Sequence, residues 1–200
     1  MSHHTYIFLK DVFHRFIALL LLIILIPVFI IIGLFVKLGS KGSVLYSQKR
    51  IGKQGKVFTF YKFRTMIVNA EKETGPVWAK DNDPRFTKIG KFLSRTNLDE
   101  LPQLFNVLRG DMYFVGPRPE RPYFVDIFSK KIKNYDDRSL VKPGLTGWAQ
   151  VNGFVGNTSL EKRVGHDLYY IKHQSLLFDL HIVLRTFWMF LKNIFSASFS

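Results

Sequence analysis

One long apolar run dominates the first part of the chain. Residues 16–36 read FIALLLLIILIPVFIIIGLFV, about 21 residues without a charge, and a helix of that length can cross a bilayer. Pro27 lies near its middle, where proline removes a backbone hydrogen bond and clashes with the preceding turn. The pattern therefore predicts a helix with a sharp bend at Pro27, in which each half reaches about 15 Å, or half of a ~30 Å hydrocarbon core.

Basic residues flank this run on both sides. Lys10 and Arg15 precede it, and Lys37 and Lys41 follow it. Because basic residues favour the cytoplasmic side, we expect both ends in the cytoplasm and a re-entrant segment. A kinked helix that spans the bilayer with a short translocated tail is the alternative. The run lacks the small-residue cleavage site of a signal peptide, so we expect residues 1–40 to stay as a membrane anchor.

The next segment has the composition of paired strands. Residues 42–66 contain two β-prone runs around Gly52 and Gly55, which predicts a β-hairpin. Its basic side chains are Lys49, Arg50, Lys53, Lys56, Lys62 and Arg64. Residues 69–86 include Gly-Pro and DNDP sequences and are interpreted as a polar loop outside the core. Such a loop can serve as a lid.

A short amphipathic helix is predicted from Asp99 to Gly110. Its apolar positions fall at i, i+3, i+4 and i+7 and are Leu101, Leu104, Phe105 and Leu108. Pro102 fits this helix only if it lies in the first turn.

The last helical pattern runs from about Leu176 to Phe195, after a Gly/Pro-rich loop over residues 141–153. Its polar side chains occupy less than half of the circumference and are Asp179, His181, Arg185, Thr186, Lys192 and Asn193. The apolar face, which includes Trp188, can pack in a core or lie in a membrane interface, and both alternatives stay open.

Together these elements predict an α+β fold. It consists of an N-terminal re-entrant membrane helix kinked at Pro27, a small β-hairpin, a short helix that begins near the acidic residues Asp99 and Glu100, and amphipathic helices that can lie at a membrane interface. The roughly 160 residues outside the apolar segment suffice for one compact domain, which we expect over residues 41–200.

The net charge of the chain points to anionic partners. Lys and Arg number 29 against 15 Asp and Glu, a formal charge of +14, so nucleic acid, anionic lipid and phosphorylated small molecules are the candidates. With 47% hydrophobic residues and 20 phenylalanines, the chain is too apolar for a typical soluble nucleic-acid binder. We therefore expect a membrane with anionic lipids as a partner, and no nucleic acid. The absence of cysteine excludes disulfides, thiolate metal sites and a cysteine nucleophile.

Asp99 and Glu100 are the candidate catalytic pair. Acidic residues in a first helical turn often do no more than complement the helix dipole. Here the excess positive charge favours the ionised form of the carboxylates. A carboxylate must be ionised to act as a nucleophile or as a ligand for a hard cation. Arg118 lies between Pro117 and Pro119, which restrict its backbone, so its guanidinium loses little conformational freedom when it binds a ligand. The chain has no P-loop, G-x-G-x-x-G or G-x-S-x-G motif, and its six histidines show no zinc-ligand spacing.

Several motifs together resemble those of the bacterial sugar transferases, the monotopic phosphoglycosyl transferases that initiate O-antigen, capsule and exopolysaccharide assembly. Besides the apolar run, the matching segments are VLYSQKRIGKQGKVFTFYKFRTM, DPRFTKIGKFL, LDELPQLFNVLRGDMYFVGPRPE, KPGLTGWAQVNG and HDLYYIKHQSLLFDLHIVLRT. They follow the family order and cover nearly the whole chain. The most specific combination is LDELPQLFNVL followed by GPRP.

The resemblance implies that the protein transfers a sugar 1-phosphate from a UDP-sugar to polyprenyl (undecaprenyl) phosphate and releases UMP. It implies a catalytic domain on the cytoplasmic face of the bacterial inner membrane and a requirement for Mg²⁺. It also implies that Asp99 is the covalent nucleophile and a metal ligand, with Glu100 as its partner. The other site residues that it implies are Lys62, Arg64 and Arg118 for substrate phosphates and Asp167 as a supporting acid.

Three positions depart from the family pattern. Ile26 stands where a serine often precedes the proline of the bend, and residues 10–14 replace a K-R-x-x-D motif. Ser94 replaces an arginine five residues before the nucleophile. The first two bear on the geometry of the bend and the third on one phosphate contact. The alternative function, from a different class, is non-catalytic binding of anionic lipid. No motif marks the sugar or the oligomeric state.

Overall fold

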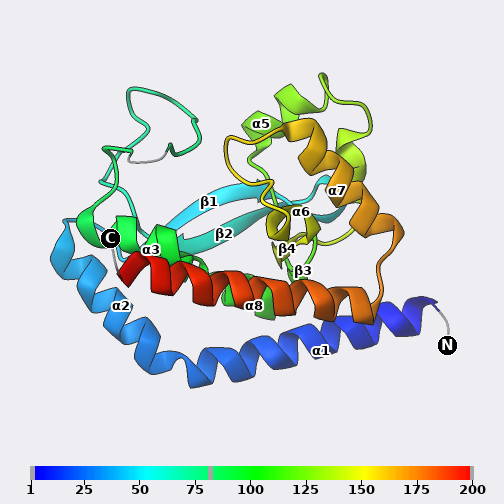
Figure 1. Ribbon diagram of the computed structural model, residues 1–200, viewed down its shortest axis with the longest axis horizontal. Coiled ribbons are helices and arrows are strands. Elements are labelled where there is room, and N and C mark those ends of the chain that lie inside the picture. The colour runs from blue at the N-terminus through cyan, green and yellow to red at the C-terminus, as the bar shows by residue number, and fades with distance from the viewer. Residues whose placement is uncertain (1–2, 81–82, 199–200) are drawn as a thin grey trace.

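Two N-terminal helices form a bent pair along one side of the molecule. The computed structural model describes residues 3–80 and 83–198. In Figure 1, helix α1 (His3–Ile24) runs along the bottom and helix α2 (Ile26–Gly39) rises along the left edge; the two are bent by 64° relative to each other. Within the described ranges, no single helix has the length and apolar composition needed to cross a membrane, but the bent pair meets both criteria as a unit.

The predicted bend within the apolar run is confirmed, but the break lies at Leu25 rather than at Pro27. Leu25 donates a hydrogen bond to the carbonyl of Leu21 and accepts one from Phe29, both at 2.9 Å, so the break leaves both bonds in place. Pro27 falls at the start of α2, where a missing N–H is tolerated.

Strands β1 (Leu45–Ile51) and β2 (Val57–Phe63) form the predicted antiparallel hairpin. The strands pair in register from Leu45–Phe63 to Ile51–Val57. The turn contains the 3-10 segment η1 (Lys53–Gly55), in which Gln54 and Gly55 have φ angles of 54° and 75°. Glycine adopts such an angle without steric cost, which explains why a glycine marks this turn.

Residues 69–86 form no helix or strand where they are described, apart from an isolated bridge between Met66 and Phe86. A helix that the sequence analysis does not predict, α3 (Lys88–Thr96), follows them. The Thr87 hydroxyl caps it by accepting a hydrogen bond from the Gly90 N–H at 3.0 Å. A Cβ on Gly90 would lie 1.9 Å from the carbonyl oxygen of Thr65, so α3 requires glycine there to approach the end of the hairpin.

The helix predicted to start at Asp99 needs a correction. Residues Leu98–Glu100 form the 3-10 turn η2, and α4 (Gln103–Arg109) begins only after Pro102, which occupies the N-cap position rather than the first turn. Pro102 has no N–H that could close an α-helical bond to the carbonyl of Leu98, which instead accepts a bond from the Leu101 N–H at 3.4 Å. Asn97, with a left-handed φ of 57°, ends α3 before this turn. Gly110, with φ 85°, ends α4 as predicted.

The remaining elements surround a small parallel pair of strands, β3 (Tyr113–Val115) and β4 (Gly144–Thr146). They are α5 (Pro122–Phe128), η3 (Tyr135–Leu140), α6 (Trp148–Val151) and α7 (Leu160–Lys172). The Gly/Pro-rich segment 141–153 thus contains a strand and a short helix. Together with the hairpin, these elements confirm a mixed fold of helices and small sheets (Figure 1).

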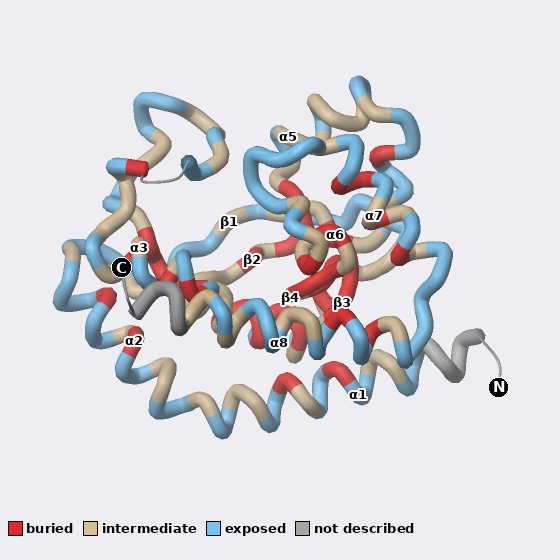
Figure 2. The backbone as a smooth tube through the Cα atoms, in the orientation of Figure 1, coloured by how far each residue is buried: buried red, intermediate tan, exposed pale blue. Residues whose placement is uncertain are grey.

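The predicted C-terminal helix is confirmed as α8 (Leu176–Ser198), and it turns much of its apolar surface outward. Asp179 is buried and accepts hydrogen bonds from Lys10 Nζ at 3.1 Å and from the Tyr170 hydroxyl at 2.7 Å. Leu177 and Trp188 are 79% and 72% exposed. Figure 2 shows exposed stretches on α8 and along both N-terminal helices.

Three clusters of buried side chains connect the helices to the rest of the molecule. The first contains Ala18 of α1 with Phe58, Phe60, Val107 and Met112. The second contains Ile32 and Val36 of α2 with Phe63 and Leu93. The third contains Val115, Val151, Tyr170 and Ile182. Both N-terminal helices therefore share their cores with the hairpin, α3 and α4.

Candidate active site

The acidic pair lies in the short turn η2, between α3 and α4. Asp99 is 4% exposed, and its neighbours Leu98 and Leu101 pack against the cluster that joins α2 to α3. Since hydrophobic contacts on both sides of the pair fix the turn, the structure holds Asp99 and Glu100 in one defined position.

Lys62 of β2 reaches the first carboxylate of the pair. Its Nζ lies 3.4 Å from Oδ2 of Asp99, and its side chain is 30% exposed. The ammonium therefore faces the buried carboxylate and remains accessible to a second anion from solvent.

Arg118, in the segment between β3 and α5, binds the second carboxylate. Its Nη1 donates to Oε2 of Glu100 at 3.0 Å, and its Nη2 donates to Oε1 of the same residue. Such a bidentate, charge-assisted pair fixes the orientation of both groups. The structure thus brings together four of the residues singled out from the sequence, which are Lys62, Asp99, Glu100 and Arg118.

The two carboxyl groups differ in their affinity for protons. Burial raises the pKa of Asp99 to about 6 against the opposing charge of Lys62, and the charge of Glu100 adds to the rise. Burial also tends to raise the pKa of Glu100, but the charge and hydrogen bonds of Arg118 outweigh it, and that pKa lies below its ordinary value. Asp99 is therefore ionised at neutral pH in a poorly solvated position, which suits a nucleophile.

Two further arginines hold the backbone around Arg118. Arg138 donates from Nη2 to the carbonyl of Arg118 at 2.9 Å and from Nε to Oδ2 of Asp167 at 2.7 Å. Arg50 donates from Nη1 to the carbonyl of Pro119 at 3.1 Å. In the described contacts, Asp167 thus acts on the Arg118 segment through Arg138.

Arg138 is a site residue that the sequence analysis misses. It lies in YDDRSL, outside every segment that carries the family resemblance, and its partner Asp167 is on α7. Nothing in the local pattern marks it, because its role depends on a contact between distant parts of the chain.

The Arg64 guanidinium lies at the end of α2. Its Nη2 donates to the carbonyls of Ser40 at 2.9 Å and Val36 at 3.3 Å, and its Nη1 donates to the carbonyl of Lys41. Val36 lies in the last turn of α2, where carbonyls have no partners within the helix, and Ser40 and Lys41 directly follow the helix. Arg64 therefore fixes the end of α2, and its contact with a substrate phosphate stays a prediction.

A cavity of about 320 Å³ opens beside Arg118. Its walls come from the β1–β2 turn, the segment 117–120 and η3, and they include the polar side chains of Gln54, Asp136 and Ser139. A cavity of this size has room for part of a small ligand. Because the walls also contain the carboxylates of Glu120 and Asp136, an anionic group of that ligand would have to lie at Arg118.

The donor chemistry of the pair fits a magnesium ion held jointly with substrate. Mg²⁺ is commonly bound by one or two carboxylates together with phosphates and water. Glu100 is engaged on both oxygens by Arg118, so Asp99 is the freer ligand. Among the described residues, no three His, Cys, Asp or Glu side chains gather into a metal site, so phosphates would have to complete the coordination.

Comparisons with known proteins identify the family of the chain. The model of the bacterial sugar transferase family matches residues 5–193. The chain is 41% identical over 183 residues to the UDP-N-acetylgalactosamine-undecaprenyl-phosphate N-acetylgalactosaminephosphotransferase of Aeromonas hydrophila, which covers 90% of this chain and 43% of that protein. It is 47% identical over 173 residues to the UDP-glucose:undecaprenyl-phosphate glucose-1-phosphate transferase of Escherichia coli K12, with coverages of 84% and 37%.

A third relative matches over most of its own length. The chain is 39% identical over 185 residues to the exopolysaccharide production protein PSS of Rhizobium leguminosarum bv. phaseoli, which covers 89% of this chain and 92% of that protein. The chain thus spans about two fifths of the length of the first two relatives and nearly all of the third.

Proposed function

Because the chain belongs to the bacterial sugar transferase family, we propose that it transfers a sugar 1-phosphate from a UDP-sugar to undecaprenyl phosphate. The first two relatives are named for this type of reaction, with N-acetylgalactosamine or glucose as the sugar. The observation that carries the proposal is the acidic pair of buried Asp99 and partly exposed Glu100, held between Lys62 and Arg118. Cationic groups around a carboxylate are what a reaction among several phosphates requires.

In the first half-reaction, Asp99 attacks the phosphorus that bears the sugar. A carboxylate oxygen forms a bond to this phosphorus, and the bond from the phosphorus to the bridging oxygen breaks. UMP leaves with the bridging oxygen and the electron pair, and the enzyme carries an aspartyl phosphosugar. Lys62 and Arg118 oppose the negative charge that gathers on the phosphates.

In the second half-reaction, an oxygen of undecaprenyl phosphate attacks the same phosphorus. The bond to Asp99 breaks, which restores the carboxylate and yields a lipid diphosphate sugar. Each half exchanges one anhydride bond for another, so atoms and charges balance without ATP. Magnesium bound at Asp99 and at the diphosphate would neutralise charge and orient the reacting phosphates.

The cavity beside Arg118 is our candidate site for the nucleotide. Arg118 belongs both to its wall and to the ion pair with Glu100, so a nucleotide bound with its phosphates at Arg118 would have them close to the acidic pair. Polar groups of Gln54 and Ser139 can bond to the base or ribose.

We also propose that α1 and α2 enter the cytoplasmic leaflet of the inner membrane and return to the same side. Towards the start of α1, Lys10 pairs with Asp179 at 3.1 Å and Asp11 with Lys142 at 2.7 Å. The end of α2 is bound by Arg64. A helix pair that crossed the bilayer would place these two ends on opposite sides of the membrane. A re-entrant pair keeps both ends in contact with the domain that contains the hairpin and α8.

Pro27 supports this bend because its nitrogen has no hydrogen to donate to the preceding turn. Ile26 has no hydroxyl that could cap the broken backbone, yet the helices still bend by 64°. The flanking basic residues favour the cytoplasmic side for both ends. We assign α8 to the membrane interface because Leu177 and Trp188 are so exposed.

The half-reaction without lipid tests the covalent mechanism. Enzyme mixed with its UDP-sugar and Mg²⁺ alone should release up to about one UMP per active site, and the peptide that contains Asp99 should gain the mass of a sugar phosphate. Asp99→Asn should lose both signals and lower turnover by roughly a thousandfold or more. Asp126→Asn, the same change on α5, is the control, and a panel of UDP-sugars identifies the sugar.

Three results together would refute this mechanism: UMP release that strictly requires lipid, no adduct, and substantial turnover by Asp99→Asn. The variant must be folded for the comparison to count. Since burial disfavours the charge of Asp99, its replacement by a neutral group of the same shape should not lower the unfolding midpoint at pH 7.

A further inference from the structure

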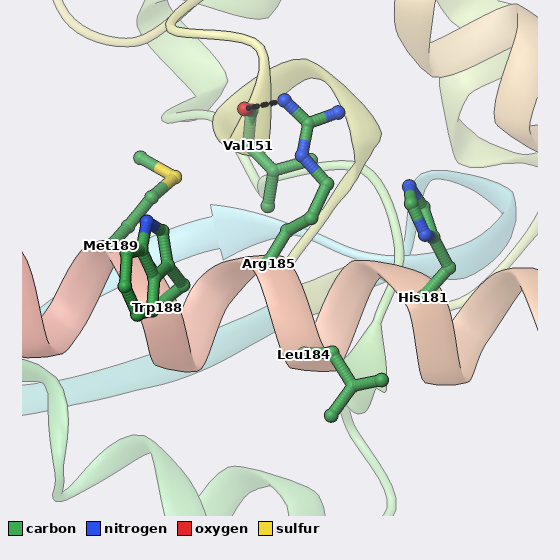
Figure 3. A pocket seen from close by; sticks show the side chains of 6 residues that line it. All are labelled: Val151, His181, Leu184, Arg185, Trp188 and Met189. Carbon is green, nitrogen blue, oxygen red and sulfur yellow. Dashed lines mark hydrogen bonds between the residues drawn. The ribbon is translucent and has the colours of Figure 1, made fainter.

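We propose that a second, non-catalytic site between α6 and α8 binds the phosphate headgroup of an anionic phospholipid. The site is a cavity of about 360 Å³ lined by Val151, His181, Leu184, Arg185, Trp188 and Met189 (Figure 3). It shares no lining residue with the cavity beside Arg118. The site rests on the membrane position of α8 that forms part of the proposed function.

Arg185 is held in a fixed orientation at this site. Its Nη2 donates to the carbonyl of Val151 at 3.0 Å, as Figure 3 shows, and its Nη1 donates to Oδ1 of Asn152 at 3.3 Å. The guanidinium also stacks over Trp148, with 5.3 Å from its central carbon to the ring centre. A guanidinium has five N–H donors, so these contacts orient it and leave donors for an anion. A group that is already ordered loses little entropy when it binds.

His181 supplies a second polar group on the same side of α8. It precedes Arg185 by one helical turn, and both side chains rise from the helix in the same direction in Figure 3. Its exposed ring lies 6.0 Å from the ring of Trp148. An imidazole N–H can donate to a phosphate oxygen. The cavity lining contains no acidic side chain, so an anion meets no repulsion from the walls.

The apolar edge of the cavity continues onto the exposed face of α8. Leu184 and Trp188 line the cavity and are 60% and 72% exposed, and Phe187 beside them is 59% exposed. Free phosphate would use the cationic part alone, whereas a phospholipid also covers this apolar edge with its acyl chains. The acceptor lipid of the reaction must instead bring its phosphate to Asp99, which is no part of this cavity. An anionic phospholipid therefore fits best, and it would hold α8 at a constant depth in the membrane.

Lipid retention tests this site without reference to turnover. The full chain is placed in nanodiscs of phosphatidylcholine and phosphatidylglycerol, and native mass spectrometry counts the phosphatidylglycerol molecules that stay bound. The wild type should retain one, and Arg185→Gln should lower its occupancy about tenfold through loss of the charge-assisted bonds. Lys192→Gln removes the same charge from an exposed position on α8 and should behave as the wild type.

Arg185→Gln also removes bonds to the backbone, so His181→Ala is the second variant. It should lower occupancy about threefold while the unfolding midpoint stays unchanged. Equal retention by folded Arg185→Gln, His181→Ala and Lys192→Gln would overturn the site. Displacement of the bound lipid by millimolar inorganic phosphate would show that the site binds free phosphate. A preference for undecaprenyl phosphate at equal mole fraction would show that the site binds the acceptor lipid. Either result overturns the proposal.

Membrane association distinguishes failure of this site from failure of the proposed function. If the wild type does not bind to vesicles that contain phosphatidylglycerol, the membrane position of α8 is wrong, and this site falls with it. If the wild type and every variant bind such vesicles but retain the lipid equally, only the headgroup site is wrong.

Discussion

Asp99 can act as a nucleophile only when it is ionised, and burial raises its pKa to about 6. The value of kcat/KM should therefore fall about tenfold per pH unit below about pH 6 and reach a plateau above it. Steady-state assays in detergent between about pH 5 and 8 measure this fall of kcat/KM at acid pH, the acid limb of the pH profile. The midpoint describes the coupled pair of Asp99 and Glu100 rather than one residue.

Lys62 influences the pH at which kcat/KM begins to fall. Its charge lowers the pKa of Asp99, so Lys62→Met should move the acid limb to higher pH. Lys49→Met, an exposed position on the same hairpin, should leave it in place. An unchanged limb in Lys62→Met would mean that this ammonium does not control the charge of Asp99.

Arg138 should matter for catalysis although it does not touch the acidic pair in the described contacts. Arg138→Lys loses the planar fork that joins Asp167 to the carbonyl of Arg118. A displaced Arg118 should slow formation of the Asp99 adduct by about ten- to a hundredfold, since small misplacements of reacting groups are costly. Single-turnover adduct formation is the measurement.

Arg109→Lys is the matched control, because that arginine is 59% exposed on α4. If Arg138→Lys unfolds more easily but forms the adduct at the normal rate, then Arg138 serves the fold and not the position of Arg118.

The residues of the acidic pair could be predicted from sequence because they occur in one continuous motif. Asp99, Glu100 and Arg118 lie within 20 positions of each other, in LDELPQLFNVLRGDMYFVGPRPE. Arg138 could not, because its contact with Asp167 bridges two elements that are far apart in the chain. The contact of Arg64 with α2 is equally non-local, and only the folded chain shows it.

At the scale of elements, Arg64 connects the hairpin to the membrane helices. Its guanidinium bonds to carbonyls at the end of α2, so Arg64→Ala should lower the stability of the fold by about 2–4 kcal/mol through loss of charge-assisted hydrogen bonds. The KM for the UDP-sugar should change less than about threefold if the residue only holds α2. Thermal unfolding in detergent and steady-state kinetics give the two values.

The opposite result would establish a substrate role for Arg64. A tenfold rise in KM with an unchanged unfolding midpoint would place its guanidinium on a substrate phosphate, as the family resemblance implies. Arg95→Ala, at the end of the neighbouring helix α3 and on an exposed position, is the control for loss of a positive charge.

Elements with a strong local signal could be predicted, and those set by tertiary contacts could not. The hairpin follows from β-prone runs around Gly52 and Gly55. A proline in an apolar run predicts a bend, though not that the break lies at Leu25. Helix α3 depends on the close approach of Gly90 to the carbonyl of Thr65, which no periodicity reveals. The end of α3 depends on the left-handed conformation of Asn97, which periodicity does not reveal either.

At the scale of the whole molecule, α1, α2 and α8 expose many apolar side chains. On α8 the core side holds Ile182 and the polar Asp179, while Leu177 and Trp188 face outward, so apolar residues lie on both sides of this helix. The exposed apolar residues of α1 and α2 include Phe16 and Phe35. Sequence periodicity could establish that α8 is two-sided, but not which side faces the core, because this depends on the ion pair with α1.

The chain contains no cysteine, so single cysteines can report which side of the membrane each end of the helix pair occupies. We expect cysteines at Ser2, which lies outside the described residues, and at Ser43 both to resist a membrane-impermeant thiol reagent added to intact cells. Both should react once the membrane is permeabilised. The physical reason is that both ends of the helix pair contact the same domain. Lys10 and Asp11 form ion pairs with it near the start of α1, and its Arg64 binds the end of α2.

Pro27→Leu probes the same arrangement from the other direction. Leucine restores the backbone donor and favours a straight helix long enough to span, so a fraction of the Ser2 cysteines should become reactive from outside. The ion pairs of Lys10 and Asp11 oppose this change, and Lys10→Gln combined with Pro27→Leu should increase the labelled fraction. Ser43 should stay unreactive in every variant. Labelling of Ser2 in the otherwise unchanged chain would show that the pair crosses the bilayer, and the re-entrant arrangement would be wrong.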